Sequence, residues 1–405
     1  MTKDVIIMGS RGYTKPYGGW ETLVHGMIDN WKEPDTNFYV IETTDNEREP
    51  WHEIVNGVHC IRVLVKDNGK FKMLKAEAKT LDILPKIIDE FKIEYPILYV
   101  LGMRVGAYFV MRRKMLRKFH VAIVFNSDGI GWKRAKYSPI EKLYSYLNNL
   151  IFNRFMTEYL VCDANEMNRI LAPQFKGRKE LPYTVTIYYG TNEAPVLSSV
   201  MPEKVSSYFN EHKIKEEQYY LMINRLVPEN SYELIIREFM KSKTKNDFVI
   251  VSNINQETKF YEKLKKDLQF ENDPRIKFVG TVYDQDILAW LRQKAIGYIN
   301  GHTLGGTNPG LLEALATTDV NLIRDCAFSR EGAADTAFYF DEEHPMSELV
   351  EKVDQMSPEE RKAIGARAKE RMRTHFSWAK VNDQYVELFD KIIDDKKKLK
   401  EGKVL

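Results

Sequence analysis

The decisive stretch of this chain reads Tyr298-Ile-Asn-Gly-His-Thr-Leu-Gly-Gly-Thr-Asn-Pro-Gly-Leu-Leu-Glu-Ala-Leu-Ala316. An apolar run typical of a buried strand leads into a glycine-rich loop, and a helical pattern follows at once. Asn308 is a good N-cap residue, and Pro309 suits the first helical position because that position needs no N–H donor. The stretch therefore predicts a strand, a loop and a helix, which together form one unit of an α/β fold.

The same alternation of short β-rich runs and helical patterns extends over almost the whole chain, as expected for βα units with buried parallel strands. In the first half the candidate strands are Asp4–Met8, Phe38–Glu42, Cys60–Val65, Ile97–Leu101, His120–Phe125, Tyr159–Cys162 and Thr184–Tyr188. In the second half they are Tyr219–Ile223, Phe248–Val251, Ile276–Val279, Ala295–Ile299, Val320–Ile323 and Ala337–Phe340. The sequence thus predicts two Rossmann-like sheets.

A chain of 405 residues is long enough for two domains of ordinary size. Turn-forming residues at 189–195 separate the halves, so we expect an N-terminal domain over 1–195 and a C-terminal domain over 196–375. The tail over 376–405 has aromatic residues at roughly helical spacing, and we expect it to cross back and brace the first domain. Ligands of open α/β sheets bind beyond the carboxyl ends of the strands, which places the expected site in a cleft between two facing domains.

Composition narrows the class of protein. Hydrophobic residues make up 43% of the chain, which excludes general disorder, and a net charge of +2 argues against binding to nucleic acid through bulk electrostatics. The N-terminus lacks the apolar run of a signal peptide, and no uncharged apolar stretch is long enough to span a membrane. Cys60, Cys162 and Cys326 have no metal or disulfide spacing and are expected to be buried thiols in a reducing compartment. We therefore expect a soluble cytoplasmic protein.

The loop before the second-half helix has the local shape of an anion site. Gly305 and Gly306 allow the backbone to approach a ligand closely, and the free N–H groups of the helix N-terminus would face a phosphate. Glu313 lies one turn further on and could accept hydrogen bonds from sugar or ribose hydroxyls. The alternative is a capped core helix whose Glu313 reaches solvent. His302 is the only histidine beside this loop, and a metal site is not expected.

A second glycine-rich loop, Gly9–Thr22, follows the first candidate strand. Its glycines do not have the spacing of the dinucleotide-binding fingerprint. Gly18 and Gly19 could supply N–H groups at a helix N-terminus for a diphosphate or an acceptor, whereas a purely structural turn is an equally simple interpretation.

Asp128 follows the candidate strand that begins at His120, where a sheet presents catalytic groups. A carboxylate there could take a proton from an acceptor hydroxyl, or Asp128-Gly129 could be an Asx turn. Trp132 could stack on a sugar, and Lys133 and Arg134 could meet an acceptor phosphate. A core tryptophan with solvated basic neighbours explains the same residues.

Positive charge gathers at several places. Arg225 follows a candidate strand and could offer a bidentate charge to a leaving diphosphate, or it could form a surface salt bridge. Residues 111–118 hold five positive charges and no acid, and Lys133, Arg134, Lys136 and the tail over 396–400 add more. Such patches suit an anionic membrane surface, although a solvated helix face and a frayed tail are an equal alternative.

Taken together, these motifs resemble glycosyltransferases of the GT-B fold, and family 4 within it. Residues 225–230, Arg-Leu-Val-Pro-Glu-Asn, resemble the Gly-Arg-Leu-x-Pro-Glu-Lys-Asn block of that family, and Asn308–Ala316 resembles its donor-binding helix. A closer resemblance is to bacterial rhamnosyltransferases of cell-wall and capsule polysaccharide assembly. It rests on Gly18-Gly19-Trp20-Glu21-Thr22, on Asp128-Gly129 with Trp132-Lys133-Arg134, and on Gly301-His302 with Gly305–Pro309.

The resemblance implies a retaining enzyme that moves L-rhamnose from dTDP-β-L-rhamnose to a sugar on a polyprenyl diphosphate carrier, without a metal or other cofactor. The implied catalytic residues are Asp128, Glu313 and Arg225. Donor binding would involve Gly305, Gly306, Thr307, Asn308, Glu313, Arg225 and His302. Acceptor binding would involve Gly18, Gly19, Glu21, Asp128, Trp132, Lys133 and Arg134. The implied location is cytoplasmic, peripheral on the inner face of the plasma membrane, with no nucleic acid as partner.

The chain departs from the family pattern at several positions. Gly305 stands where the family has the first of two paired glutamates, and Asn230 replaces the lysine that usually follows the Pro-Glu pair. Thr303 and Gly131 stand where close relatives often have acids. Transfer of glucose or galactose, inverting chemistry with Asp128 as base, and a non-catalytic partner subunit are therefore the alternatives.

Overall fold

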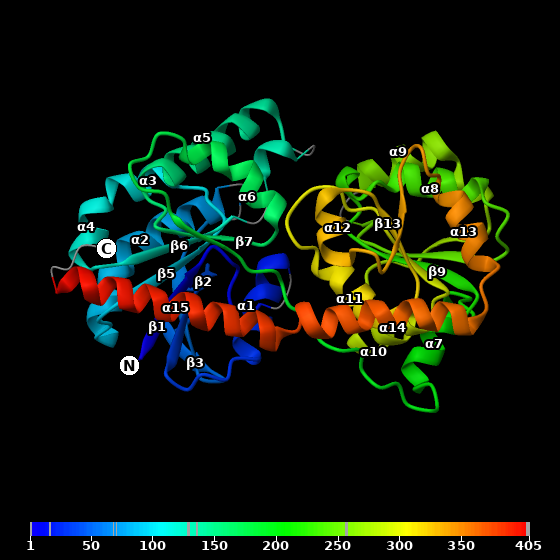
Figure 1. The fold of residues 1–405 in the computed structure, drawn as a ribbon, viewed down its shortest axis with the longest axis horizontal. Coiled ribbons are helices and arrows are strands. Elements are labelled where there is room, and N and C mark those ends of the chain that lie inside the picture. Colours follow the sequence, from blue (N-terminus) through cyan, green and yellow to red (C-terminus); the bar gives the residue numbers. More distant parts are fainter. Residues whose placement is uncertain are drawn as a thin grey trace. The chain divides into compact units, whose positions relative to one another are not determined.

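The computed structural model describes residues 2–15, 18–67, 69, 71–127, 130–134, 137–255 and 258–401. The chain forms two compact units (Figure 1). Unit 1 comprises Met1–Gly190 and Trp378–Leu405, and unit 2 comprises Thr191–Ser377. Each unit is built around one mostly parallel sheet, so the α/β class predicted from the alternating pattern is confirmed.

The described sheet of unit 1 has eight strands in the order β3-β4-β2-β1-β5-β6-β7-β8. They are β1 (Lys3–Met8), β2 (Thr36–Thr44), β3 (His52–Val55), β4 (Val58–Leu64), β5 (Pro96–Leu101), β6 (Ala122–Asn126), β7 (Tyr159–Cys162) and β8 (Tyr183–Thr186). From the central β1 the chain first adds β2 and β4 on one side and then adds β5 to β8 on the other. The order therefore reverses between β1 and β5, where open α/β sheets bind ligands.

Every strand predicted for this half is present, β7 with the predicted ends and the others with shifted ends, but β3 was missed. It pairs antiparallel with β4 at the sheet edge, through a turn at Asn56 and Gly57, both with positive φ. Asn-Gly is the favoured pair for such a two-residue hairpin, and this signal in the sequence could have revealed the strand.

The sheet of unit 1 is accompanied by α1 (Gly19–Asp29), α2 (Lys72–Phe91), α3 (Gly106–Met111), α4 (Arg113–Lys118), α5 (Pro139–Phe155), α6 (Asn165–Leu171) and α15 (Trp378–Lys400), with short 3-10 turns η1 (Gly131–Lys133) and η2 (Ala172–Phe175). The last of these helices, α15, returns from unit 2 and packs against α1 and β1. Its Tyr385 hydroxyl lies 2.6 Å from that of Tyr99 in β5, and its Asn382 side chain donates to the Met27 carbonyl at 3.0 Å. The predicted bracing of the first domain by the tail is confirmed.

The described sheet of unit 2 has six parallel strands in the order β11-β10-β9-β12-β13-β14. They are β9 (Tyr219–Ile223), β10 (Asp247–Val251), β11 (Ile276–Phe278), β12 (Gly297–Asn300), β13 (Asn321–Arg324) and β14 (Phe338–Phe340). This is the Rossmann order, with the reversal between β9 and β12. The helices are α7 (Glu203–Glu211), α8 (Tyr232–Lys241), α9 (Thr258–Leu268), α10 (Gln285–Gln293), α11 (Pro309–Thr317), α12 (Ala327–Ala333), α13 (Met346–Asp354) and α14 (Pro358–His375), with turns η3 (Pro228–Asn230) and η4 (Phe270–Asn272).

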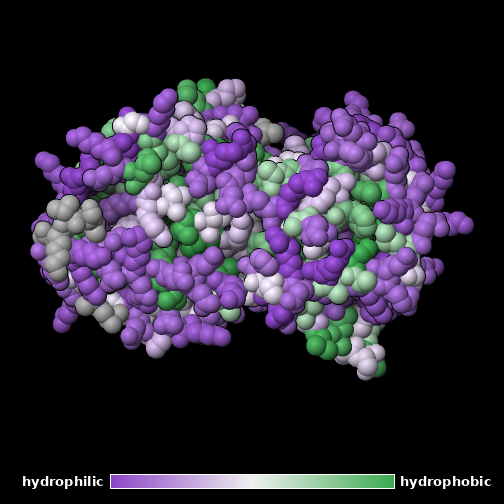
Figure 2. Space-filling view, viewed as in Figure 1, coloured by the Kyte–Doolittle hydropathy of each residue, from purple (hydrophilic) through white to green (hydrophobic). Residues whose placement is uncertain are grey.

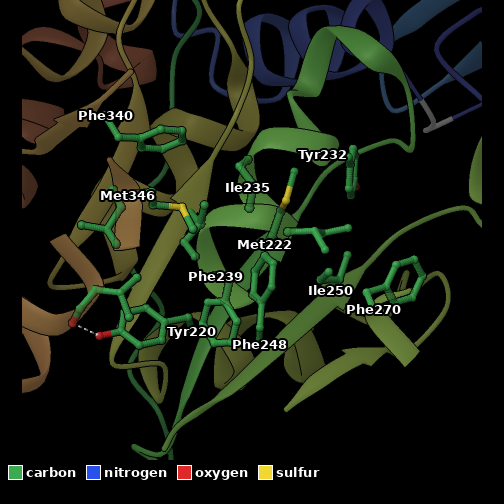
Figure 3. Packing of buried hydrophobic residues seen from close by; sticks show 14 of the residues in the cluster. Tyr220, Met222, Tyr232, Ile235, Phe239, Phe248, Ile250, Phe270, Phe340 and Met346 are labelled. Carbon is green, nitrogen blue, oxygen red and sulfur yellow. Dashed lines mark hydrogen bonds between the residues drawn. The ribbon is translucent and has the colours of Figure 1, made fainter. Parts of the chain in front are cut away.

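The core of unit 2 fixes β9, the strand that precedes Arg225. Figure 3 shows Tyr220 and Met222 of β9 packed with Phe239 of α8 and Phe248 of β10, all of them buried. The Tyr220 hydroxyl donates to the Val350 carbonyl at 3.0 Å, so even the polar end of this side chain is satisfied. A close-packed strand of this kind holds the loop at its carboxyl end in a defined position.

The structure corrects the expectation for one cysteine and limits the expectation for the basic tail. Cys60 and Cys162 are buried free thiols, as predicted, but Cys326 is only half-buried. The basic tail is largely paired, since Lys396 lies 2.6 Å from Glu158 and Lys400 lies 3.0 Å from Glu94. Among the described residues, no helix combines the length and apolar character needed to cross a membrane.

Candidate functional site

The loop between β12 and α11 carries most of the predicted donor-binding residues. The Asn308 side chain accepts a hydrogen bond from the Leu311 N–H at 3.3 Å, and Pro309 is the first residue of α11, so the predicted cap is confirmed. Gly305 has φ +127°, a conformation that strains any other L-residue. A methyl group added there would lie 3.3 Å from the His302 ring, so a larger residue would also press on that side chain.

This loop is joined to the turn that follows β9. The Thr303 N–H donates to the Glu229 carbonyl at 3.0 Å, and the Ser231 hydroxyl donates to the Gly301 carbonyl at 2.8 Å. The His302 ring nitrogen Nδ1 lies 2.9 Å from the Asn230 side-chain oxygen. Because β9 and β12 are neighbours at the reversal point, their two following loops form one structure. Asn230 positions His302 here.

Arg225 lies in the first of these loops, just beyond β9. Its backbone is fixed, because its carbonyl accepts from the Asn230 side chain at 2.7 Å and from the Val227 N–H at 2.9 Å. Its side chain is exposed, and within the described part of the chain its guanidinium makes no salt bridge or hydrogen bond. A surface salt bridge, the alternative for this residue, is therefore not formed with described residues, and the charge is available to an anion.

Glu313 has a partner that sequence reasoning missed. It forms an ion pair with Arg292 of α10, and the side chains are 41% and 10% exposed respectively. The same two charges lie near the buried Tyr298 hydroxyl, where burial is the main cause that raises the pKa of Tyr298 to about 12. Glu313 thus reaches solvent with one side and neutralises a mostly buried arginine with the other. Nothing in the local sequence of α10 distinguishes Arg292 from a surface residue.

Three polar groups at this edge of the sheet are buried without a hydrogen-bond partner in the described structure. They are both carboxylate oxygens of Glu229 and the side-chain N–H groups of Asn224 and Asn300. Buried polar atoms are nearly always paired in native proteins, so unpaired ones call for water or a ligand. Asn224 and Asn300 lie at the ends of β9 and β12, where position alone could have singled them out, whereas Glu229 lies in η3, further along the loop after β9.

In unit 1, the predicted glycine-rich loop follows β1 at the reversal point of its sheet. A side chain at Gly9 would overlap the Leu101 carbonyl, so glycine is required for the close approach to β5. Helix α1 begins at Gly19 with Gly18 as its N-cap, and no side chain caps it. The buried Glu21 carboxylate accepts from the Arg11 N–H at 2.6 Å, which gives Glu21 a structural task inside the loop.

The same loop is also held from β2. The buried Glu42 accepts from the Thr14 N–H at 2.7 Å and from its hydroxyl at 3.0 Å. Two N–H groups of the loop are thus already bound to carboxylates.

Asp128 and Gly129 lie outside the described residues, so their predicted roles stay predictions. The residues before them are well fixed, since the Asn126 side chain donates to the Tyr99 hydroxyl at 2.7 Å. Trp132 is half-buried in η1, with its ring edge against Tyr146 at 5.7 Å between centroids. Lys133 is exposed and Arg134 is half-buried. Trp132 is therefore neither a fully buried core residue nor a fully exposed ring on which a sugar could stack.

No group of three or more His, Cys, Asp or Glu side chains among the described residues could hold a metal ion. Near the loops after β9 and β12, the described groups that could receive a ligand include backbone N–H groups, the Arg225 guanidinium and the carboxylates of Glu229 and Glu313. Such a set suits an anionic, hydroxyl-bearing molecule.

Comparison with known proteins identifies the fold. Residues 2–192 match a family described as Domain of unknown function (DUF1972), and no curated protein matches the chain in sequence. Sucrose-phosphate synthase from Thermosynechococcus elongatus is similar in structure, with TM-score 0.76, 12% identity, and coverage of 97% of this chain and 100% of that one. The HepE protein of Anabaena, solved with UDP and glucose, is also similar in structure. Its TM-score is 0.69 and its sequence identity is 15%, with coverage of 96% of this chain and 100% of that one.

A trehalose-phosphate synthase (UDP-forming) from Burkholderia vietnamiensis gives TM-score 0.71 and 10% identity, with coverage of 96% of this chain and 100% of that one. At such low identity the likeness concerns the fold alone. The fold is that of GT-B glycosyltransferases, as the sequence motifs predicted.

Proposed function

We propose that this protein is a glycosyltransferase that uses a nucleotide sugar bound by unit 2. The observation that carries the proposal is the combination of the Gly305-Gly306 backbone, which leads into the N-terminus of α11, with the exposed Arg225, whose guanidinium pairs with no described residue. The two lie on joined loops at the reversal point of the sheet, where such folds bind ligands. The similarity of fold to HepE, whose solved structures include one with UDP-glucose, supports this choice of donor class.

In this proposal the N–H groups of Gly305 to Thr307 and the Arg225 guanidinium hold the diphosphate. Their positive potential stabilises the negative charge that develops as the glycosidic bond breaks, which is the main electrostatic task of the reaction. Glu313 accepts hydrogen bonds from ribose or sugar hydroxyls with the side that faces solvent. Asn308 and His302 keep the loop in shape. No metal is required in this scheme.

We assign acceptor recognition to unit 1, with Gly18, Gly19, Trp132, Lys133 and Arg134, and Asp128 assisting deprotonation of the acceptor hydroxyl. The proposed reaction moves L-rhamnose from dTDP-β-L-rhamnose to a sugar on a polyprenyl diphosphate, with retention at the anomeric carbon. Family resemblance in the motifs supports this choice of donor, acceptor and stereochemistry.

The test incubates the purified protein with a panel of nucleotide sugars and a polyprenyl-diphosphate-linked GlcNAc acceptor. Mass spectrometry identifies the sugar that is transferred, and NMR of the product determines the anomeric configuration. We expect transfer from dTDP-rhamnose with retention. Transfer of glucose or galactose would correct the donor, inversion would correct the mechanism, and no transfer with any donor would favour a non-catalytic partner subunit.

Arg225→Ala tests the donor site directly. We expect kcat/KM for the nucleotide sugar to fall by about a hundredfold, because one preorganised charge at the leaving group is lost. Stability should change by less than about 0.5 kcal/mol, since the exposed guanidinium holds no described residue. Arg237→Ala, which removes an exposed arginine of α8 from its pair with Glu233, is the matched control and should keep parent activity.

A further inference from the structure

The loop that follows β5 is fixed on both sides of Arg104. This loop joins β5 to α3 at the reversal point of the unit 1 sheet, where open α/β sheets bind ligands. The Arg104 N–H donates to the Glu77 carboxylate at 3.0 Å, and the Arg104 carbonyl accepts from the Tyr144 hydroxyl at 2.8 Å. The Gly102 N–H donates to the Asn126 carbonyl at 3.1 Å. Arg104 therefore has a defined position at the edge of the sheet where a ligand is expected.

The Arg104 side chain is held by a buried carboxylate. Glu77 of α2 is 2% exposed, and it forms an ion pair with the Arg104 guanidinium in addition to its bond with the Arg104 backbone. Burial raises the pKa of Glu77, and the charge of Arg104 opposes that effect. One buried carboxylate thus orients both the backbone and the side chain of Arg104.

The rest of the Arg104 guanidinium is available to a ligand. Within the described part of the chain, Glu77 contacts only its Nη1 nitrogen, and the side chain is 36% exposed. The N–H groups of Nε and Nη2 point the same way and form a bidentate edge, and neither nitrogen is buried. Figure 2 shows that hydrophilic residues cover most of the visible surface, so an exposed charge by itself indicates no site. Arg104 differs from an ordinary surface cation because its direction is fixed before a ligand binds.

A second polar group at this edge of the sheet lacks a partner. Ser10 in the loop after β1 is 3% exposed, and its hydroxyl has no hydrogen-bond partner among the described residues. The loop after β1 lies against the end of β5, because a Cβ atom at Gly9 would overlap the Leu101 carbonyl. Buried polar atoms are nearly always paired, so the Ser10 hydroxyl indicates that water or a ligand binds at this edge.

Stability alone does not explain the pair of Glu77 and Arg104. A buried ion pair is often no more stabilising than an apolar pair of similar size, because both charges lose their hydration. A second ion pair joins α2 to the end of α3, through Asp82 and Arg112, and its carboxylate is 42% exposed. The pair at Arg104 differs from it in the buried carboxylate and in its place at the carboxyl end of β5.

We propose that Arg104, positioned by Glu77, binds an oxyanion of the acceptor, either a phosphate or a carboxylate. A guanidinium recognises both groups through two parallel N–H···O bonds, because its fork matches the spacing of their oxygens. The inference rests on the proposed function, which assigns the acceptor to unit 1. It makes Arg104 a specificity-determining residue that selects acceptors with a negative charge.

Arginine labelling with phenylglyoxal tests anion binding without turnover. The full chain is labelled alone and with inorganic phosphate, glucuronate or neutral methyl glucoside, and peptide mass spectrometry measures the labelling rate of each arginine. We expect phosphate or glucuronate to slow the labelling of Arg104 by about fivefold or more, because a bidentate anion covers its reactive edge. Methyl glucoside should have no effect, and Arg112 is the internal control.

The anion that protects Arg104 identifies the source of the charge, a phosphate for a phosphorylated acceptor and glucuronate for an acidic sugar. Absence of protection by both anions would refute the proposal. Equal protection of Arg112 would also refute it, because the effect would then be one of ionic strength.

The double variant Arg104→Gln with Glu77→Gln tests the role of the pair in transfer. It removes the cation together with its buried partner, so no unpaired charge is left in the fold. We expect KM to rise by about tenfold or more for the charged acceptor, which is polyprenyl-diphosphate-linked GlcNAc or octyl glucuronide. KM for the nucleotide sugar and for neutral octyl GlcNAc should stay at the parent values. Glu77→Gln alone should give a smaller rise in the same KM, because Arg104 keeps its charge and loses its orientation.

The matched control is Arg112→Gln with Asp82→Asn, which removes the more exposed pair of α2 and should keep every KM at the parent value. Circular dichroism checks that each variant is folded. An unchanged KM for the charged acceptor, or a rise in KM for the nucleotide sugar instead, would overturn the proposal while transfer itself stands. If the parent transfers no sugar, the proposed function fails, and protection of Arg104 from labelling still decides whether the anion site exists.

Discussion

At the scale of single residues, Glu313 has two possible tasks that one substitution cannot separate. It neutralises Arg292, and in the proposed reaction it also contacts the donor. We expect Glu313→Ala to abolish turnover and to lower the free energy of unfolding by about 1–3 kcal/mol, because a mostly buried guanidinium loses its partner. Urea denaturation and transfer assays measure the two effects.

The double variant Glu313→Ala with Arg292→Met separates the tasks. It removes both charges, so we expect stability to return to within about 1 kcal/mol of the parent while turnover stays lost. Recovery of parent turnover in the double variant would mean that Glu313 serves only to neutralise Arg292.

At the scale of elements, the contact between α1 and α15 predicts that a substitution favoured by helix propensity lowers the stability of the protein. Gly26 lies inside α1, and in the interior of a helix alanine is normally about 1 kcal/mol more stabilising than glycine. A methyl group at Gly26, however, would overlap the indole of Trp378 at the start of α15. We expect Gly26→Ala to destabilise the protein by about 1–3 kcal/mol in urea denaturation.

Gly332→Ala in α12 is the control for this effect. There an added methyl group would find its nearest atom, in the Leu311 side chain, at 3.7 Å, which is an ordinary contact. That change should be neutral or stabilising. If Gly26→Ala were stabilising as well, the packing of α15 on α1 would be different from the one described.

At the scale of the whole molecule, unit 1 is completed only by the end of the chain. α15 buries Val381, Tyr385, Leu388, Phe389 and Ile392 in unit 1. At about 1.5–3 kcal/mol for each large apolar side chain, this burial is comparable to the total stability of a domain. We expect a fragment of residues 1–190 to lack cooperative unfolding and a peptide of residues 378–405 to restore it.

The fragment of residues 191–377 is the internal control, because unit 2 is continuous in sequence and should fold alone. Cooperative unfolding of the 1–190 fragment without the peptide would contradict the prediction. Circular dichroism during thermal unfolding distinguishes the outcomes.

The sequence by itself determined the parallel strands, because parallel strands buried on both faces read as continuous apolar runs. It also determined the cap of α11, because Asn308 and Pro309 act within one turn of the helix. It also singled out Arg225 and the glycine loops, since residues at strand ends are positioned by the strands themselves. Only the tertiary structure decided that Glu313 pairs with Arg292 and that the Glu229 carboxylate is buried without a partner among the described residues. These features depend on contacts between side chains of elements that are far apart in sequence. Local sequence patterns do not indicate such contacts.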